Sequence, residues 1–573
     1  MVFITMVFVT FVAHVMGKHH NKQTYYNPAM KLNYDASKRD FHGWSSMDHG
    51  RLSLNHLGDV DSNRLSSKTF SNLSKNNVHE EMNGQKNYSG YTMFSLTLNH
   101  HQLKLLWKFS EKKPLDIWSG APGGETTTLD ILVAPDIKTS FKDFVTRYNI
   151  SHSVAIEDYQ NLLNSQKVKV STRGSGSARK EFSLYEYNQY DEIVQYLREV
   201  EQSCPKIVKL LSIGKTTEKR RLWLVQISTA RRGARRPFVL LEAGSHAREW
   251  IGPATALYII SRLVGEDCGA TGLSKYLDWH IIPLFNPDGY EYTHTRDRMW
   301  RKTRSTLENT TCKGVDVNRN FDFHWGQTGA SLNQCLFYLT DTGASLNQCL
   351  CYLTETGASL NPCQSDYAGP KPFSEPEARA LRNYVLSDAK RILLYVSLHS
   401  YGKVGQYTVD REPSTNKVFV LTTQRSSWAL VQILRSRHGT TLFVLTAIDS
   451  VWELKKTLAD KANKAIIDEG GEPYFIGTAP QLLYSASGSS LDWMRGVGGV
   501  KYGFVAELPG GGKEGFDMPP TGINKTAREF FAALRVFGEL ANKKGKIFMG
   551  KRQLRSYRRK IRRNMIRLRK FHR

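Results

Sequence analysis

The pattern of hydrophobic and polar positions predicts a small folded unit followed by a much larger one. Residues 18–87 are polar and carry almost no apolar periodicity, so we interpret them as a linker. Beyond them, alternating apolar positions predict strands in YTMFSLTL, TTLDILVAP and SHSVAIED, and helical spacing predicts helices in HQLKLLWKF and DIKTSFKDFVTRYN. The resulting order β-α-β-α-β over residues 88–170 predicts a small α+β domain.

From residue 182 to residue 543, predicted strands and helices alternate along the chain. The aliphatic runs FVLLEAG, RILLYVSLHS and YGFVAELPG predict buried strands, whereas ATALYIISRL and TAREFFAALRVFGEL have the apolar spacing of helices. This alternation is typical of domains whose sheet is covered by helices. We therefore predict the fold class α/β, with a large mixed-sheet domain preceded by the small α+β domain.

Two segments interrupt the pattern of the large domain. Residues 329–342, 343–356 and 357–369 all begin with GASLN, and this period of 14 residues is too short and too rarely repeated for a solenoid. We interpret it as a duplicated loop. The hydrophobic pattern of residues 403–450 does not connect with that of the segments before and after them. This leaves three interpretations open: a displaced core strand, a rebuilt pocket wall, or mis-joined coding segments.

Two short segments carry signals of processing. Residues 1–17 contain no charged side chain, and their length suits the apolar core of a signal peptide better than a membrane span. Residues 171–181 are rich in Gly and Ser and include Arg173, Arg179 and Lys180. They form either an exposed site for proteolytic cleavage or an ordinary linker between domains.

The net charge of +26 is concentrated at the C-terminus. Residues 543–573 contain 15 Lys or Arg and no acidic residue, so the rest of the chain carries +11. Within the basic tail, which we delimit at residues 544–573, apolar residues recur at helical spacing along one narrow stripe. Such a helix could bind a polyanion (an acidic lipid surface, a glycan or a nucleic acid), and the alternative is a solvated tail without a partner.

His246 and Glu249 lie where a predicted buried strand gives way to a predicted helix. Because α/β enzymes commonly carry their chemistry at this junction, the pair is a candidate site, although a helix-capping acid beside a hydrogen-bonded histidine gives the same pattern. His399, at the end of the strand RILLYVSLHS, could supply a third ligand. Two histidines and one carboxylate are a typical ligand set of catalytic zinc, and Asp316 could fix the tautomer of one histidine.

Six segments resemble the signature segments of one family and occur in that family's order: GSHAREW, NPDGYEYTHTRDRMWRKTRS, GVDVNRNFD, LHSYG, LLYSASGSSLDW and YGFVAEL. The family is that of the zinc metallocarboxypeptidases of the carboxypeptidase A/B type, and the resemblance covers about residues 182–540 apart from the two irregular segments. Residues 88–170 resemble the family's activation propeptide. The resemblance implies a secreted zymogen that a trypsin-like protease activates within residues 171–181, one zinc ion per chain, and removal of C-terminal residues from peptides or proteins.

The resemblance also implies a role for each residue of the site. His246, Glu249 and His399 would hold zinc. Glu507 would act as general base on the attacking water, and Arg304 would stabilise the oxyanion. The residues implied to bind the substrate are Arg248, Asn318, Arg319, Tyr401, Tyr484 and Leu491.

Leu491 occupies the position that, in the family, lines the base of the side-chain pocket. An acid there would select Lys or Arg, whereas leucine favours apolar or aromatic C-terminal residues because a buried cation would lack a counter-charge. Cys312 and Cys363 resemble the family's loop disulfide, and three further cysteines of the repeat fall between them. The total of seven cysteines is odd, so at least one thiol has no partner within the chain.

We therefore expect a secreted, monomeric zinc carboxypeptidase, A-like in specificity, that requires no nucleic acid. Two rival hypotheses stay open. One is a carboxypeptidase-like binding protein that residues 403–450 have made catalytically impaired, and the other is a polyanion-binding protein that acts through its basic tail. The presence of all the motif residues favours the enzyme.

Overall fold

The structure is a computed structural model, and it describes most of the chain beyond residue 83. The described ranges are 84–123, 126–171, 182–230, 235–269, 271–326, 357–401, 418–421, 435–436, 439–440, 449–478, 486–500, 502–510 and 515–571. Several predictions fall outside them: the signal peptide, most of the linker, the cleavage segment after residue 171, the first two copies of the repeat, and Tyr484.

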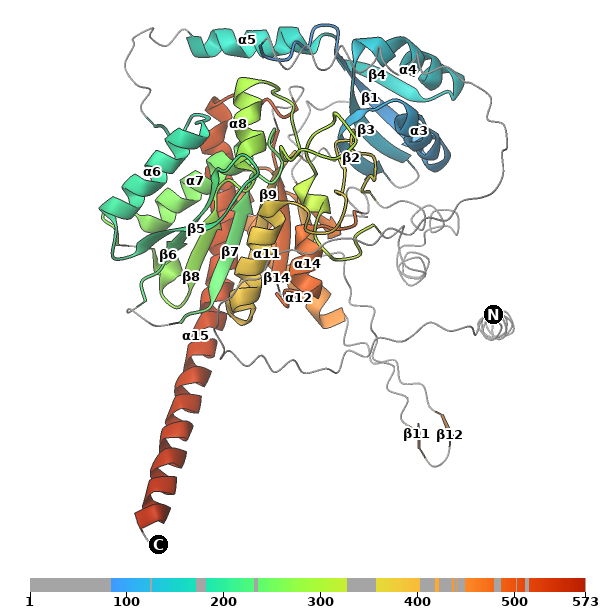
Figure 1. Cartoon of the computed structure of the whole chain (residues 1–573). Helices are drawn as coiled ribbons and strands as arrows, with labels where there is room; N and C mark the ends of the chain where they lie inside the picture. Colours follow the sequence, from blue (N-terminus) through green and yellow to red (C-terminus); the bar gives the residue numbers. More distant parts are fainter. Residues whose placement is uncertain are drawn as a thin grey trace, which may run out of the picture. The chain divides into compact units, whose positions relative to one another are not determined.

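The small domain is a four-stranded antiparallel sheet with the order β2-β3-β1-β4 (Figure 1). Its elements are β1 (Thr92–Asn99), α3 (His100–Lys112), β2 (Asp116–Gly123), β3 (Thr126–Val133), α4 (Pro135–Arg147), β4 (Ser151–Ile156) and α5 (Tyr159–Ser171). Helix α3 begins at a capping box in which Asn99 and Gln102 bind each other's backbone amides. Leu106 of α3 and Phe141 of α4 pack in one apolar cluster against the sheet.

The sequence pattern does not predict strand β2, and the residues of β2 explain why. DIWSGAPG contains two glycines and a proline, which are rare inside central strands. β2 lies at the edge of the sheet, where only one of its sides is paired and proline is tolerated. The small domain therefore has the order β-α-β-β-α-β, followed by α5, instead of β-α-β-α-β.

The other side of the small domain packs against the large domain. One apolar cluster joins Tyr88, Met93, Trp118, Leu132 and Tyr159 to Met299, Tyr401 and Phe516. The hydroxyl groups of Tyr88 and Tyr159 donate hydrogen bonds to Asp297 and Asp517 of the large domain. Apolar packing and buried hydrogen bonds therefore both hold the small domain in place.

The large domain is built around a mixed sheet whose described strands have the order β13-β10-β14-β9-β7-β8-β6-β5. Its strands are β5 (Val208–Lys215), β6 (Arg221–Ile227), β7 (Phe238–Ala243), β8 (Asp278–Ile282), β9 (Ile392–Ser400), β10 (Val418–Leu421), β13 (Phe475–Thr478) and β14 (Tyr502–Leu508). β14, β9, β7 and β8 are parallel neighbours, and antiparallel pairs flank them on both sides. The predicted α/β class with a mixed sheet is confirmed.

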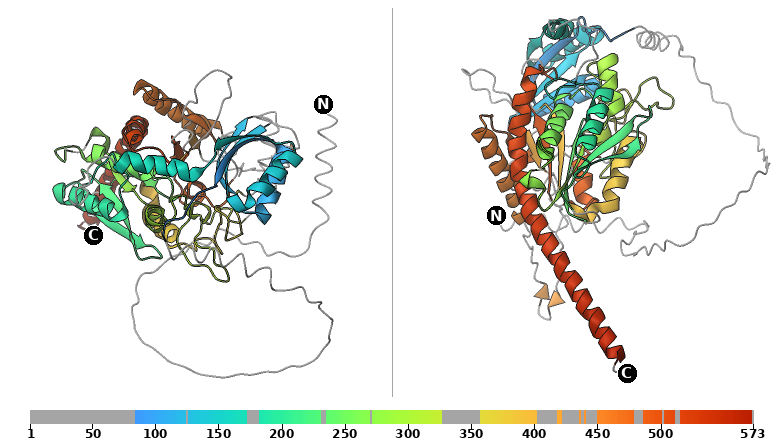
Figure 2. Two further views of the ribbon diagram at one scale, coloured as in Figure 1. Left: turned by 90° about the horizontal axis from the view of Figure 1, so that it is seen from above. Right: turned by 90° about the vertical axis from the view of Figure 1, so that its left-hand side faces the viewer.

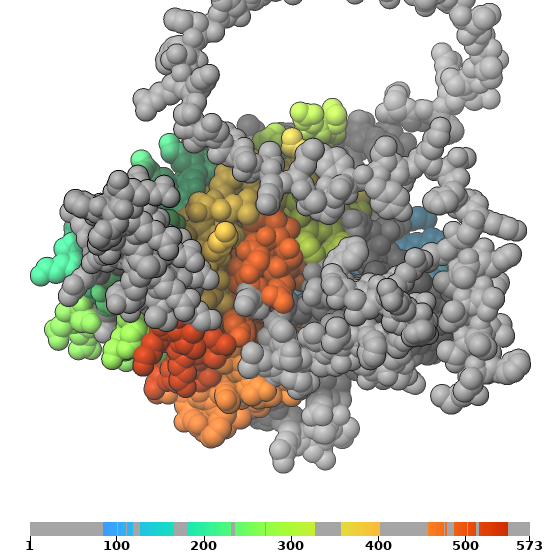
Figure 3. Space-filling model, turned by 90° about the horizontal axis from the view of Figure 1, so that it is seen from below, coloured from blue at the N-terminus to red at the C-terminus, as the bar shows by residue number. Residues whose placement is uncertain are grey.

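Helices cover both faces of this sheet (Figures 1 and 2). They are α6 (Tyr190–Ser203), α7 (Ile251–Val264), α8 (Pro287–Thr295), α11 (Pro376–Asp388), α12 (Asp449–Asp468), α14 (Ser490–Gly496) and α15 (Thr521–Phe571), with short 3-10 turns at Gly272–Ser274, Val317–Arg319 and Ala389–Arg391. In β7, Val239 and Leu241 pack in the cluster of α7, α12 and α15, whereas Phe238 and Leu240 pack in that of α11 and α14. Figure 3 shows α11 beside α14, and α12 beside α15, on one surface of the molecule. Both faces of β7 are therefore apolar, as expected for a covered parallel strand.

The irregular residues 403–450 contribute one strand to the main sheet. β10 lies between β13 and β14, parallel to the first and antiparallel to the second. Among the described strands, the short β11 (Arg435–Ser436) and β12 (Gly439–Thr440) form a separate antiparallel pair. The described residues of this segment therefore include one strand of the main sheet, and the three interpretations stay open.

Two disulfides join the described residues. Cys312 bonds to Cys363, the pair that the family resemblance implies. Cys204, at the end of α6, bonds to Cys268, which follows α7, and the sequence analysis did not pair these two. Four of the seven cysteines are thereby accounted for.

Helix α15 continues from the folded domain into the basic tail. Its turns up to Gly545 pack on the domain, since a Cβ at Gly545 would lie 2.8 Å from the carbonyl oxygen of Tyr276. Beyond that glycine the helix extends away from the sheet (Figures 1 and 2). No helix in the described part of the chain has both the length and the apolar character that crossing a bilayer requires.

Candidate active site

The candidate catalytic residues lie at one edge of the sheet, where β7, β9 and β14 all end. His246 and Glu249 lie in the loop between β7 and α7, and His399 is the penultimate residue of β9. Glu507 lies beside His399 because β14 pairs with β9 in parallel register at this point. Three neighbouring parallel strands therefore bring together four residues that are far apart in the sequence.

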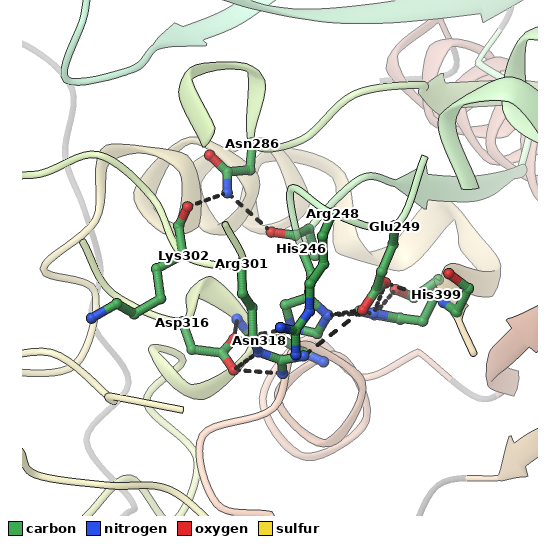
Figure 4. A network of polar contacts seen from close by, with 12 residues as sticks. His246, Arg248, Glu249, Asn286, Arg301, Lys302, Asp316, Asn318 and His399 are labelled. Carbon is green, nitrogen blue, oxygen red and sulfur yellow. Dashed lines mark hydrogen bonds and ion pairs between the residues drawn. The ribbon is translucent and has the colours of Figure 1, made fainter. Parts of the chain in front are cut away.

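The loop after β7 is shaped by a glycine and an asparagine. Gly244 has a φ of 73°, and a Cβ there would approach Leu284 Cδ1 to 2.9 Å, so the turn favours glycine. Asn286 Nδ2 donates to the carbonyl oxygens of Ser245, at 3.3 Å, and Lys302, at 3.0 Å (Figure 4). These contacts fix the backbone from which the side chain of His246 projects.

His246, Glu249 and His399 point toward one another (Figure 4). The Nδ1 atom of His246 lies 2.6 Å from Glu249 Oε1, and that of His399 lies 3.1 Å from Glu249 Oε2. The two Nδ1 atoms are 3.1 Å apart. All three side chains are buried, and one donor atom from each lies within 4.8 Å of the others. Two imidazole nitrogens and a carboxylate in this arrangement fit a zinc ion.

The electrostatics of this triad favour a cation. Burial opposes the ionisation of Glu249, but His246 and His399 hold its pKa below the usual range. Burial likewise opposes protonation of His399, but Glu249 raises the pKa of His399 to about 9. The carboxylate is therefore ionised at neutral pH and supplies the negative charge that a divalent cation needs.

Asp316 contacts the outer nitrogen of His246, Nε2, at 3.1 Å. Arg301 donates to the other carboxylate oxygen of Asp316 from Nε at 3.1 Å and from Nη2 at 2.7 Å. Burial opposes ionisation of Asp316, but Arg301 and His246 hold its pKa well below the usual range. An ionised Asp316 accepts the Nε2 proton of His246 and leaves Nδ1 as the free lone pair toward the triad.

Glu507 is a further carboxylate at this edge of the sheet. Burial raises the pKa of Glu507 to about 7, although the nearby His399 opposes the increase. A carboxylate with a pKa near neutrality can accept and return a proton at physiological pH. This chemistry suits a general base next to the triad.

Arg304 and Arg301 differ in what their guanidinium groups contact. Its guanidinium stacks over the rings of Tyr292, at 3.5 Å, and Trp300, at 4.4 Å, and its Nε lies 3.9 Å from Glu218. Arg301 is the arginine that reaches the triad, with Nη1 3.8 Å from Glu249 Oε1. The segment RMWRKTR is not helical, so its repeated arginines point in different directions, and residue type alone could not distinguish them.

Arg248, Asn318 and Arg319 lie close to the triad. Arg248 is 1% exposed, and Figure 4 shows it and Asn318 beside His246 and Asp316. Asn318 Oδ1 accepts a hydrogen bond from the backbone of Ser490 at 2.9 Å. The buried Arg319 has Nη1 4.0 Å from Asp316 Oδ2. The structure therefore gathers these three predicted substrate-binding residues at the same edge as the triad.

Two other predicted residues are buried in apolar surroundings. Tyr401 packs on Trp118 of the small domain and on Phe516. Leu491, the second residue of α14, belongs to the apolar cluster that includes Tyr395 and Val505.

The sequence analysis missed two polar residues behind the triad, Glu242 and Ser397. Ser397 Oγ lies 3.0 Å from the outer nitrogen of His399, and Glu242 accepts from Ser397. Ser397 could have been found from the strand period of two, because that period places Ser397 and His399 on the same face of β9. Glu242 could have been singled out as well, because it is an acidic residue inside an otherwise apolar run.

A buried His₂Glu triad, with a carboxylate of near-neutral pKa beside it, defines a site for metal-dependent hydrolysis. Comparison with known proteins agrees. Residues 193–533 match the family described as zinc carboxypeptidase, and residues 96–166 match the family described as carboxypeptidase activation peptide. The chain belongs to the zinc carboxypeptidase family and carries the family's activation peptide, so it is a metallocarboxypeptidase made as a precursor.

Individual relatives show how far the similarity extends. Carboxypeptidase B of Astacus astacus is 32% identical over 352 residues, which cover 61% of this chain and 95% of that protein. Carboxypeptidase A6 of Mus musculus is 29% identical over 440 residues, which cover 76% of this chain and 84% of that protein. Among solved structures, thrombin activatable fibrinolysis inhibitor superposes with a TM-score of 0.58 at 26% identity, covering 80% of this chain and 99% of that one. Carboxypeptidase A of Helicoverpa armigera shares the fold, with a TM-score of 0.60 at 24% identity over 79% and 98% of the two chains.

Proposed function

We propose that this chain is the secreted, monomeric zymogen of a carboxypeptidase that removes apolar or aromatic residues from the C-termini of peptides and proteins. The observation that carries the proposal is the buried triad of His246, Glu249 and His399 with Glu507 beside it. One zinc ion per chain would be held by the triad. When bound, zinc would supply a Lewis acid that polarises the scissile carbonyl group.

The surrounding residues supply the rest of the chemistry. Glu507 takes a proton from the attacking water and delivers it to the leaving amine. Arg301, which lies 3.8 Å from Glu249 Oε1, stabilises the negative oxygen that develops on the substrate. In this proposal Arg301 takes the role that the sequence analysis gave to Arg304.

Recognition of a free C-terminus requires a cation that pairs with a carboxylate. Arg248 and Arg319 are buried guanidinium groups near the triad, and guanidinium is the side chain best suited to bidentate carboxylate binding. Asn318 and Tyr401 would contact the substrate in the same region, and Tyr484 would close over the bound terminus. Arg248 already binds one carboxylate, that of Asp116, with Nη1 2.8 Å from both oxygens.

That contact also supports the zymogen proposal. Asp116 and Trp118 belong to β2 of the small domain, and Trp118 packs on Tyr401 and Phe516 next to Arg248. A substrate carboxylate would have to displace Asp116 from Arg248. Cleavage within residues 171–181 frees the small domain and exposes the site.

The preference for apolar residues rests on Leu491. Its side chain is 4% exposed within an apolar cluster, so the pocket offers no acid at this position to a basic substrate. Full burial of a large apolar side chain contributes about 1.5–3 kcal/mol, whereas a buried cation without a partner loses its hydration. We expect peptides ending in Phe or Leu to be cleaved at least a hundredfold faster, in kcat/KM, than peptides ending in Arg.

The test combines activation and specificity. Trypsin treatment should release a fragment containing residues 88–170 and raise activity, while zinc analysis should show one ion per chain. Peptides that differ only in their last residue, Phe or Arg, then report the preference, and Leu491→Asp should narrow or invert it. Full activity before cleavage refutes the zymogen proposal, and faster cleavage of the Arg peptide by the unmodified enzyme refutes the role of Leu491.

A second candidate function, polyanion binding, rests on the continuous helix α15. Its last part carries the basic tail, residues 544–573, beyond the end of the folded domain at Gly545. A helix rises about 1.5 Å per residue, so the cationic residues of the tail follow one another along a narrow rod. Retention on immobilised heparin, compared with a chain truncated after Lys543, tests the proposal. Equal salt concentrations for elution of both chains would contradict it.

A further inference from the structure

We infer that Glu242 is a positioning residue for the metal site: acting through Ser397, its buried carboxylate holds His399 in the tautomer that presents Nδ1 to zinc. The inference rests on the proposed ligation by His246, Glu249 and His399. It concerns residues behind the triad, which touch neither the metal nor the substrate.

Glu242 is a fully buried acid in an apolar strand. It lies on β7, 0% exposed, on the same face as Phe238 and Leu240. An unpaired carboxylate in such a place would be strongly destabilising, so the acid must be held by specific hydrogen bonds. Three buried hydroxyl groups provide them.

The three hydroxyl groups come from both sides of the site. Tyr395 donates to Glu242 Oε2 at 2.5 Å, and Ser245 donates to Oε1 at 2.6 Å. Ser397 Oγ lies 3.2 Å from Oε1 and 3.3 Å from Oε2. Of these three, Ser397 also contacts a ligand histidine, His399.

The chain of hydrogen bonds has only one consistent direction. A carboxylate can only accept, so the single hydrogen of Ser397 points to Glu242. The oxygen of Ser397 is then left to accept, and the Nε2 atom of His399, 3.0 Å away, must donate. A histidine that binds zinc must be neutral. With its proton on Nε2, its lone pair is on Nδ1, which is the atom that faces Glu249 and His246.

His246 reaches the same state by a direct contact. Its Nε2 lies against Asp316, and its Nδ1 faces the triad. Each ligand histidine is therefore backed by a buried carboxylate, Asp316 in contact and Glu242 through one hydroxyl group. A supporting group of this kind typically contributes tenfold to a hundredfold in metal affinity.

The experiment measures zinc affinity of the full-length protein, stripped with a chelator and titrated with Zn²⁺ against a fluorescent zinc chelator. Glu242→Gln and Ser397→Ala should each weaken zinc binding by about tenfold to a hundredfold, because each breaks the same chain of hydrogen bonds. The double variant should be no weaker than the more affected single variant. Ser245→Ala and Tyr395→Phe each remove one hydroxyl from Glu242 without touching His399, and they should leave zinc affinity unchanged.

Thermal unfolding of the metal-free proteins separates positioning from general stability. Loss of zinc affinity in Glu242→Gln and Ser397→Ala, at melting temperatures equal to those of the two controls, supports the inference. Three outcomes overturn the inference. Zinc affinity is unchanged in Ser397→Ala, the two single losses of zinc affinity multiply in the double variant, or all four single variants lose zinc affinity equally. Should Glu242→Gln fail to fold, Ser397→Ala alone decides. Absence of zinc binding by the unmodified protein would instead overturn the proposed function itself.

Discussion

Asp116 binds Arg248, the arginine for which we propose a role in substrate binding, so we predict that Asp116→Asn makes the uncleaved precursor active. Arg248 is 1% exposed, and its Nη1 lies 2.8 Å from both oxygens of Asp116. No hydrogen-bond partner for its Nε or Nη2 occurs among the described residues, so Asp116 is its main anionic contact there. The substitution leaves a buried cation facing a neutral amide.

The size of the effect follows from the burial of the two partners. A hydrogen bond to a charged group contributes about 1.5–3 kcal/mol. The side chain of Asp116 is 28% exposed, so solvent screening places the loss toward the lower end, at about 2 kcal/mol. At about 1.4 kcal/mol per tenfold, the fraction of precursor with a displaced small domain should rise about thirtyfold.

The assay is kcat/KM of the full-length precursor on a peptide ending in Phe, before and after trypsin treatment. Asp143→Asn is the matched control, because it makes the same change of charge at an exposed position of α4. Only Asp116→Asn should raise the activity before cleavage, and all three proteins should be equal after it. Equal activity of the three precursors, or an equal rise in both variants, would refute the reasoning.

Three further predictions concern the large domain. Arg301→Ala should lower kcat by at least about a hundredfold, whereas Arg304→Ala should act mainly on stability; similar kcat in both variants would contradict the geometry. Glu507→Gln should keep bound zinc and lose turnover by about 10²–10⁴-fold, and near-normal kcat would exclude it as the base. Burial, reinforced by Glu375, raises the pKa of Glu377 well above its usual range, so the folded protein holds a proton that the unfolded chain releases above about pH 4.5. The free energy of unfolding should then fall by up to about 1.4 kcal/mol per pH unit above that value. Chemical unfolding at pH 5 and pH 7.5 should show that this free energy falls less in Glu377→Gln than in the unmodified protein. An equal decrease in both proteins would refute this.

The triad could be predicted from the sequence because its residues lie at the ends of strongly apolar strands. His246 follows FVLLEAG and His399 ends RILLYVSLHS, and burial on both faces makes such parallel strands easy to recognise. Arg301 could not be separated from Arg304, because outside a helix or strand no period relates sequence spacing to direction. Glu242 was missed because its partners, Ser245, Tyr395 and Ser397, are ordinary hydroxyl residues whose convergence depends on the pairing of β7 with β9.

The outer parts of the sheets were less predictable for a related reason. β2 and β10 are peripheral or short, and β2 carries glycine and proline, so neither has the long apolar run of β7 or β9. Tertiary pairing decides whether such segments become strands, since their own preference is weak. The disulfide between Cys204 and Cys268 was missed because sequence spacing alone does not determine which cysteines meet.

The two irregular segments differ in how closely they affect the site. The repeat enters between two fixed points: Cys312 bonds to Cys363, and Arg319 Nε donates to the carbonyl oxygen of Gly357 at 2.7 Å. The first two copies lie between Arg319 and Gly357 in the sequence, and each doubling of the length of a flexible loop costs about 0.6 kcal/mol. Residues 403–450, by contrast, supply β10, whose Val418 pairs with Glu507 on the side opposite His399. The position of the proposed base therefore depends on strand pairing from both neighbours, and β10 is one of them.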